Sequence, residues 1–260
     1  MRDRSRAASS STSRNTTRTL RRIDAAGRWV DGVGLAALLP VSDVVLPSLW
    51  EAVAGTRAVD WAVEGDDGKL EFTPEMDRCW RWKDELAVRG LACVGKHLGR
   101  WQALVAPRLV PALWTAAAER REALGPFERE LAAAVEQAGP STGPQLRALL
   151  GAEKKAVDKA VVSLQRAVVL TNAGVVEQRQ GWGAIAVDLV ERRGELAHVP
   201  DADSELVRCV LASSGEVSAA DVGGALGHRL KRSRDLLEEL VEAGEASRRD
   251  ENGLALYRSI

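Results

Sequence analysis

The stretch GEVSAADVGGALGHRLKRSRDLLEELVEAGEASRRDENGLALYR, which runs from Gly215 to Arg258, contains the clearest structural signals in the chain. Ser218 is a typical residue before a helix and Gly227 a typical residue after one, so a short helix is predicted between them. A second helix is predicted over 228–243, because large apolar residues recur there at helical spacing. These residues are Leu230, Leu237, Leu240 and Val241.

Two further signals lie on either side of these helices. Residues 204–215 predict another helix, which starts at a capping Ser204 and stops at Gly215. Asn252–Gly253 predicts the turn of a β-hairpin. Three helices followed by a hairpin is the order of elements in a winged helix, a small fold that places its third helix in the major groove of DNA.

The same order occurs twice more. Residues 127–193 contain two helices that end at Gly139 and Gly151, a third helix with an apolar face, and a hairpin whose predicted tip includes Asn172, Gly174 and 179–183. Residues 19–107 contain two helices, a third that Thr73 caps and Pro74 begins, and a hairpin within 91–107. Residues 108–124 predict a linking helix. We expect five Trp residues of this unit to fill its core: Trp29, Trp50, Trp61, Trp80 and Trp82.

The predicted fold class is therefore mainly α with short β-hairpins (α+β), organised as three consecutive winged-helix units. The expected boundaries are a disordered basic tail at 1–18, a first unit at 19–107, a linking helix at 108–126, a second unit at 127–193, a linker at 194–203 and a third unit at 204–260.

Composition excludes several classes of protein. Hydrophobic residues make up 45% and charged residues 28% of the 260 residues, as in ordinary globular domains. The longest apolar run, Val33–Val41, is too short to span a bilayer, so we expect no membrane partner. Three scattered Cys residues favour a reducing, cytoplasmic location over a disulfide framework. The formal net charge of -1 favours no charged partner, although residues 1–22 carry seven Arg and one acidic residue.

Positive charge is concentrated where a winged helix would contact DNA. In the third unit, basic residues occupy the front half of the third helix, and Glu238, Glu239 and Glu242 occupy the rear. The helix dipole favours acidic residues in the first turn, so this order costs electrostatic free energy. Contact between the basic residues and DNA phosphates would offset that cost. The basic residues are His228, Arg229, Lys231, Arg232 and Arg234, with Arg248 and Arg249 before the hairpin turn.

The other two units carry basic residues at corresponding places. They are Lys154, Lys155, Lys159 and Arg179 in the second unit, and Lys83, Lys96, His97 and Arg100 in the first. Duplex DNA is the expected partner of these residues, through phosphate contacts that position the protein. The alternative is a protein–protein adaptor, because a dedicated DNA-binding domain is usually basic overall and this chain is not.

Three segments carry a family resemblance: LAALLPVSDVVLPSLWEAVAG (35–55), WRWKDELAVRGLACVGKHLGR (80–100) and GPSTGPQLRALLG (139–151). They resemble the AlkZ-type DNA glycosylases, and more closely the shorter AlkZ-related proteins of high-G+C bacteria. The resemblance covers about 20–193, and the third unit by architecture. It implies tandem winged helices and, for the true glycosylases, excision of alkylated or crosslinked bases by hydrolysis of the N-glycosidic bond.

The chain departs from this family at the catalytic motif. The glycosylases carry a Gln–apolar–Gln or Gln–apolar–Asp motif after the first helix, which positions the attacking water. The corresponding residues here are Ala36, Ala37 and Leu38, which can neither orient nor deprotonate water. Asp84 and Glu85, which could flank a DNA cleft as general bases, are the remaining catalytic candidates.

No cofactor or metal site is expected. Cys93 and His97 have a spacing that suits a metal, but Cys79 is the one further residue that could join them, which leaves a zinc site short of ligands. The leading hypothesis is a non-catalytic DNA-binding protein that acts in damage recognition or regulation. An active glycosylase and a protein adaptor remain the alternatives.

Overall fold

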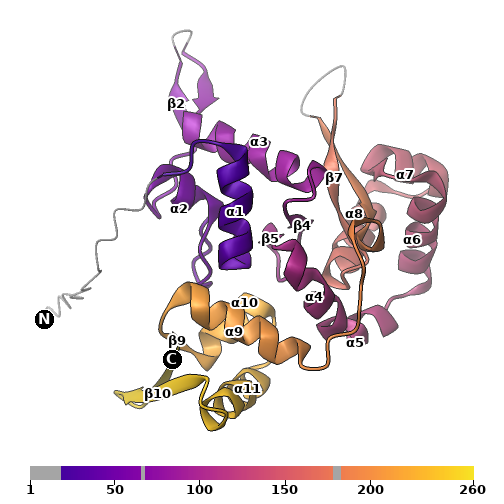
Figure 1. The fold of residues 1–260 in the computed structure, drawn as a ribbon. Helices are drawn as coiled ribbons and strands as arrows, with labels where there is room; N and C mark the ends of the chain where they lie inside the picture. Colours follow the sequence, from indigo (N-terminus) through magenta and orange to yellow (C-terminus); the bar gives the residue numbers. More distant parts are fainter. Residues whose placement is uncertain (1–18, 66–67, 178–182) are drawn as a thin grey trace, which may run out of the picture.

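Short helices and small antiparallel sheets form three lobes in the computed structural model, which describes residues 19–65, 68–177 and 183–260 (Figure 1). The first lobe contains α1 (Ile23–Val33), β1 (Leu35–Ala37), α2 (Leu49–Ala54), α3 (Pro74–Val88), β4 (Cys93–Gly95) and β5 (Ala103–Val105). Between α2 and α3 it carries a hairpin made of β2 (Ala62–Glu64) and β3 (Leu70–Phe72).

The second and third lobes follow the same order. The second contains α6 (Pro126–Ala138), β6 (Ser141–Thr142), α7 (Gly143–Leu150), α8 (Lys154–Arg166), β7 (Leu170–Val176) and β8 (Ala184–Leu189). The third contains α9 (Ala202–Ser214), β9 (Val217–Ser218), α10 (Ala219–Leu226), α11 (Leu230–Glu242), β10 (Ala246–Glu251) and β11 (Leu254–Ser259). The links are η1 (Pro107–Leu109), α4 (Val110–Ala116), α5 (Ala118–Glu122) and η2 (Val190–Arg193).

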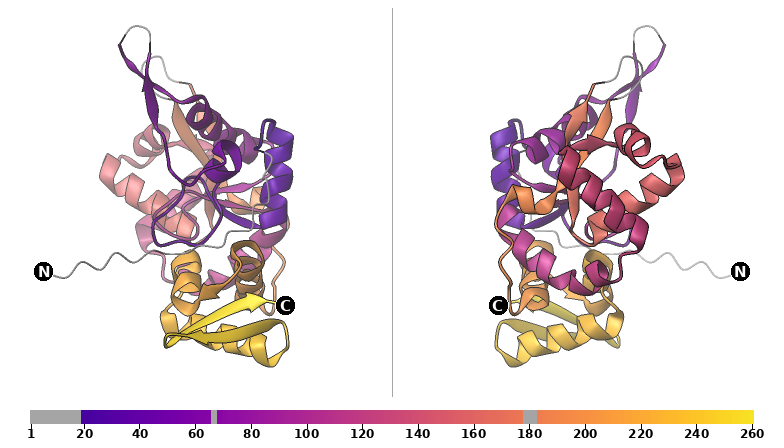
Figure 2. Two further views of the ribbon diagram at one scale, coloured as in Figure 1. Left: turned by 90° about the vertical axis from the view of Figure 1, so that its left-hand side faces the viewer. Right: turned by 90° about the vertical axis from the view of Figure 1, so that its right-hand side faces the viewer.

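The three-stranded sheets share one connectivity. Their strand orders are β1-β5-β4, β6-β8-β7 and β9-β11-β10, so in each lobe the last strand lies in the middle. In each lobe, the strand that precedes the second helix pairs with one edge of the last strand. The other strand of the hairpin pairs with the opposite edge. The β2–β3 and β7–β8 hairpins both project at the end of the molecule opposite the third lobe (Figures 1 and 2).

The first and third lobes share a hydrophobic core. Along β1, β4 and β5 the buried residues alternate between two faces, as side chains of a strand must. One face, with Ala36, Val94 and Leu104, packs on α1–α3. The other face, with Leu35 and Val105 among others, packs with α4 and the helices of the third lobe. The second lobe has a separate core around α6, α8 and β7–β8.

Several local predictions are confirmed. Thr73 caps α3 through its hydroxyl, and Pro74 begins that helix. Ser218 forms a reciprocal capping box with Asp221 at the start of α10, and Gly227 ends α10 in the left-handed conformation. Asn252 and Gly253 both have positive φ, as the predicted two-residue hairpin turn requires.

Other local predictions are wrong. Asp201, not Ser204, precedes α9 as its N-cap. Leu230 is 51% exposed, because the first turn of α11 leaves the core. Asn172 and Gly174 lie within β7, not at the hairpin tip, and 179–182 fall outside the described residues.

The region 108–124 is also different from its prediction, because it breaks into η1, α4 and α5 instead of one helix. Of the five Trp residues predicted to fill the first core, Trp61 is instead 50% exposed beside β2. None of the helices among the described residues combines the length and the apolar character that a membrane span requires.

Candidate nucleic-acid interface

The start of α11 presents three basic side chains to solvent. Arg229 precedes the helix in an extended conformation, and Lys231 and Arg234 lie in its first turns. All three are exposed, and none forms an ion pair with another residue in the described part of the chain. The free N–H groups of a helix start also favour an anion. This end of α11 can therefore bind an anionic partner without first breaking an internal ion pair.

His228 and Arg232 of the same cluster turn inward to Asp203. Arg232 Nη2 lies 2.8 Å from Asp203 Oδ2, and His228 Nε2 lies 3.6 Å from Asp203 Oδ1. The three side chains border a cleft of about 740 Å³ between the α4–α5 turn and the starts of α9 and α11, together with Arg120. Asp203, which the sequence reasoning missed, therefore neutralises part of the positive charge that had been expected to face DNA.

Because His228 lies in this cleft, its protonation makes the free energy of unfolding depend on pH. Burial lowers the pKa of His228 below its usual 6.5, opposed by Asp203 and assisted by Arg120 and Arg232. The unfolded chain thus binds the proton more readily than the folded protein. We expect the free energy of unfolding to be highest above pH 6.5 and to decrease as the pH falls below it. Urea titrations from pH 8 to 5 should show a smaller decrease for His228→Gln, and an equal decrease would contradict the assignment.

The two basic residues of the β10–β11 hairpin that were predicted to contact DNA are paired with acidic residues. Arg248 donates hydrogen bonds to Glu238 at 2.8 Å and to Asp250 at 3.0 Å. Arg249 donates to carboxylates of Glu216 at 2.7 Å and Glu251 at 3.0 Å. The sequence carried a signal for two of these pairs, because strand residues two apart share a face. A phosphate would have to compete with these carboxylates.

The second lobe contributes two free lysines. Lys155 and Lys159 are exposed on the front half of α8, and no ion pair involves them among the described residues. Lys154 is paired with Asp158 at 3.2 Å. Arg179, predicted in the hairpin of this lobe, lies outside the described residues. Among the described residues, the predicted contact residues of this lobe that remain without an ion pair are therefore both on α8.

Two predicted DNA contacts in the first lobe are wrong because their side chains are buried. Lys83 is 2% exposed; its ammonium group lies 2.7 Å from Asp84 and over the Trp80 ring. His97 is fully buried. Lys96 is half-buried and its backbone N–H donates to the Gln165 side chain, whereas Arg100 is exposed at the β4–β5 turn. Of this cluster, Arg100 is the side chain most accessible to a phosphate.

The residues considered for catalysis are either buried apolar side chains or acids paired with basic residues. Ala36, Ala37 and Leu38 lie on or just after β1 and are at most 3% exposed. No polar side chain can replace them there without burying an amide or carboxylate in the core. Asp84 pairs with Lys83, and Glu85 pairs with Arg89. Among the described residues, no group of three or more His, Cys, Asp or Glu side chains could hold a metal ion.

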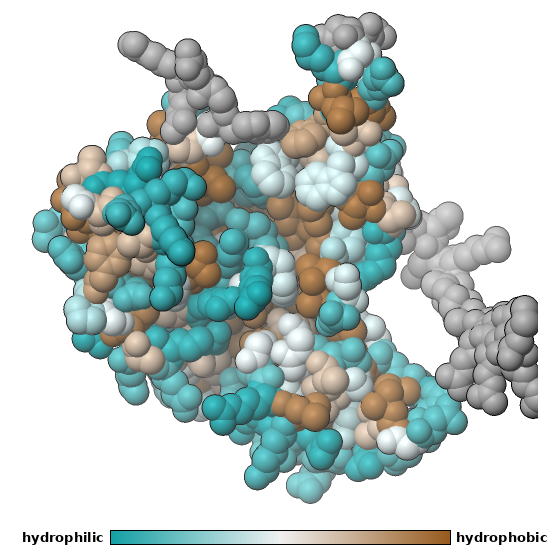
Figure 3. Space-filling view, turned by 180° about the vertical axis from the view of Figure 1, so that it is seen from behind, coloured by the Kyte–Doolittle hydropathy of each residue, from teal (hydrophilic) through white to brown (hydrophobic). Residues whose placement is uncertain are grey.

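The surface seen from behind mixes hydrophilic and hydrophobic residues in small areas (Figure 3). Teal marks acidic and basic residues alike, so the contacts of each basic cluster decide where an anion can bind.

The order of elements, the strand pairing and the basic helix starts can now be compared with known proteins. The sequence model of the AlkZ-related family matches residues 20–206, which is most of the chain. The chain belongs to the AlkZ-related family. A search of curated proteins gives no match for the sequence.

One solved structure shows a similar fold. The DNA glycosylase AlkZ of Streptomyces sahachiroi superimposes with a TM-score of 0.50 at 12% identity over 69% of this chain and 55% of its own length. The two proteins thus share a fold, and the AlkZ-related chain spans about half the length of that glycosylase. The DIP2311 protein of Corynebacterium diphtheriae matches with a TM-score of 0.23 at 14% identity, over 72% of this chain and 39% of that one.

Proposed function

We propose that this protein is a non-catalytic, DNA-binding member of the AlkZ-related family that acts in damage recognition or regulation in the cytoplasm. The observation that carries the proposal is the free basic start of α11 in a lobe with winged-helix connectivity. Arg229, Lys231 and Arg234 occupy the helix end that a winged helix inserts into the major groove. The same arrangement recurs, with Lys155 and Lys159, at the start of α8.

We further propose that each lobe is a winged-helix domain, with units at 19–107, 127–193 and 204–260, joined through 108–126 and 194–203. The shared strand order supports this division. The continuous core of the first and third lobes supports a fixed relation between those two units, which would set the spacing of their contacts on DNA.

A titration of labelled duplex DNA at several salt concentrations tests the proposal. Phosphate contacts release counterions, so the logarithm of the affinity should fall linearly with the logarithm of the salt concentration, by about 0.9 per contact. We expect measurable binding at low salt and a steep salt dependence. Absence of binding at low salt, or affinity independent of salt, would refute the proposal.

The proposal also predicts that the protein does not excise bases. The buried alanines at the position of the family's catalytic motif support this expectation, because a glycosidic hydrolase needs a side chain that positions water. Incubation with duplexes that contain alkylated or crosslinked bases should yield no abasic sites, whereas an active glycosylase in parallel should. Abasic product that depends on Asp84 or Glu85 would instead favour an enzyme.

A protein adaptor is the second candidate, for a specific reason. A groove of about 410 Å³ runs between α11 and the β10–β11 hairpin, and Leu230 and Leu254 are each more than half exposed beside it. Exposed large apolar residues around a groove are typical of a protein-binding surface. A stoichiometric partner retained after nuclease treatment, together with no DNA binding, would favour this candidate.

A further inference from the structure

Cys93 and His97 form a close buried pair where the first lobe meets the second. Cys93 Sγ lies 3.3 Å from His97 Nε2, on β4 and on the turn that follows it. Their four-residue separation suits a metal, but the sequence offered too few ligands for a metal site, and the structure provides another explanation for the pair. A thiol in contact with an imidazole is the arrangement that activates cysteine as a nucleophile.

Gln165 fixes the orientation of the imidazole. The Nδ1 atom of His97 lies 2.8 Å from the backbone carbonyl of Gln165 on α8. A carbonyl accepts but cannot donate, so Nδ1 carries a proton and Nε2 faces the sulfur as the proton acceptor. The backbone just after α8 is strained, because Val168 adopts a φ of 57°. Strain of this kind is often retained at functional sites.

Two further residues border the sulfur. Thr171 Oγ1 on β7 lies 3.3 Å from Cys93 Sγ and donates its own proton to the Val94 carbonyl at 3.0 Å, whereas Arg193 contributes positive charge that favours the thiolate. Burial opposes ionisation of both members of the pair. The contacts outweigh it, because His97 and Arg193 lower the pKa of the Cys93 thiol below 9.0, and Cys93 raises the pKa of His97 above 6.5.

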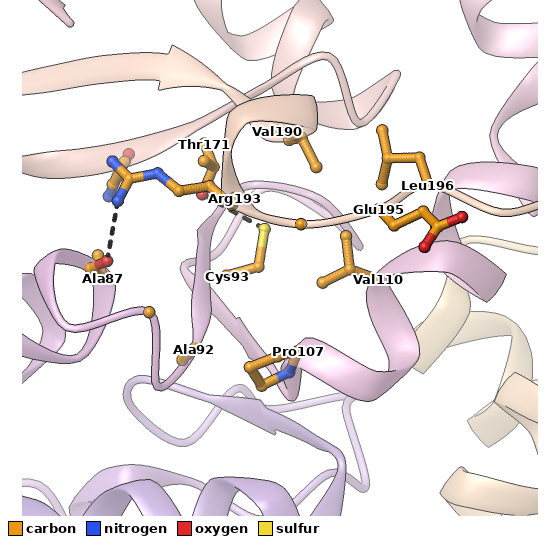
Figure 4. Close-up of a pocket in the computed structure, with 13 residues that line it drawn as sticks. Ala87, Ala92, Cys93, Pro107, Val110, Thr171, Val190, Arg193, Glu195 and Leu196 are labelled. Carbon is orange, nitrogen blue, oxygen red and sulfur yellow. Dashed lines mark hydrogen bonds between the residues drawn. The ribbon is translucent and has the colours of Figure 1, made fainter.

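A small cavity gives access to this sulfur. It has a volume of about 50 Å³ and is lined by Cys93, Thr171 and Arg193 together with apolar residues. Figure 4 shows the Cys93 sulfur pointing toward the space that Thr171 and Arg193 border, with Val110 and Pro107 opposite. A cavity needs about 10–15 Å³ on this measure to hold one water, so this one has room for a small polar molecule of a few atoms.

We propose that Cys93 and His97 form a site that reacts with hydrogen peroxide. The thiolate attacks one peroxide oxygen, a S–O bond forms and the O–O bond breaks. The leaving hydroxide takes the proton of the His97 imidazolium and becomes water. Sulfur loses two electrons and becomes a sulfenic acid, while the peroxide is reduced. The cavity size excludes bulky hydroperoxides, and the site requires nothing from the proposed DNA-binding function.

The other two cysteines are internal controls. Burial raises the pKa of Cys79 to about 12 and of Cys209 to about 11. The full-length protein is treated with hydrogen peroxide from pH 5.5 to 9, and the site of the ~16 Da mass increase is located by peptide mass spectrometry. We expect the rate at Cys93 to fall less steeply with decreasing pH than the rate of an ordinary thiol, because its pKa is lowered. A thiol with a pKa near 9 would slow about tenfold per pH unit below it.

Matched variants at Arg193 separate charge from packing. Arg193→Gln removes the positive charge beside the sulfur and should slow the oxidation of Cys93 at pH 6 severalfold, whereas Arg193→Lys retains the charge and the rate. If Arg193→Gln does not fold, the pH profile of the unaltered protein still decides. A Cys93 rate that rises with pH as an ordinary thiol does, or oxidation first at Cys79 or Cys209, would overturn the proposal.

Discussion

Replacement of Arg229, Lys231 and Arg234 together by Gln is expected to weaken the binding of duplex DNA by about tenfold to a hundredfold near 100 mM salt. The three side chains are exposed, lie at the start of α11 and have no internal acid partner within the described chain. Each lost phosphate contact should reduce the log–log salt slope by about 0.9, so the slope should fall by about 2 to 3. Anisotropy titrations at four salt concentrations measure both quantities.

A charge-matched variant controls for net charge. Replacement of Arg22, Arg81 and Arg208 by Gln also removes three positive charges, but each of these residues already pairs with a carboxylate. We expect this control to retain most of the affinity and slope. Equal losses in the two variants would show a long-range effect of net charge, and no loss in the first would remove α11 from the interface.

The regular elements could be predicted because their signals are local. A cap such as Thr73 or Ser218 acts within one turn of its helix, and Asn252–Gly253 determines its own hairpin. The strands β1, β6 and β9 were not predicted, because two or three residues are too few to show alternation. The pairing of these strands with the last strand of each lobe depends on tertiary contact.

The candidate interface was predicted less well for the same reason. The basic clusters are visible in the sequence, but several of their ion pairs are made with residues from other elements. Asp203 neutralises Arg232 from 29 positions away, and Glu216 contacts Arg249 from 33 positions away. The Cys93–His97 spacing was visible too, whereas Gln165, which orients His97, is 68 residues distant. Sequence shows which charges exist, and the fold determines which remain free.

Gly34→Ala is expected to destabilise the protein by about 3 kcal/mol or more, because two costs add. Gly34 ends α1 with a φ of 75° and a ψ of -53°, a conformation that side chains with a Cβ rarely adopt. An added Cβ would also lie 2.5 Å from Cys209 Sγ of α9 and 2.8 Å from Leu109 Cδ1 of η1. The substitution would therefore force apart the packed contact between the first and third lobes.

The same helix provides the control for this substitution. An added Cβ at Gly32, two residues earlier in α1, would meet no atom within 4 Å, and its φ is not in the positive range. Gly32→Ala should therefore stabilise the protein by about 0.5–1 kcal/mol, through helix propensity alone. Urea unfolding of the two variants should thus give shifts of opposite sign. A Gly34→Ala protein as stable as the unaltered chain would mean that the α1–α9 contact yields without cost, and that the first and third lobes are not held in one fixed arrangement.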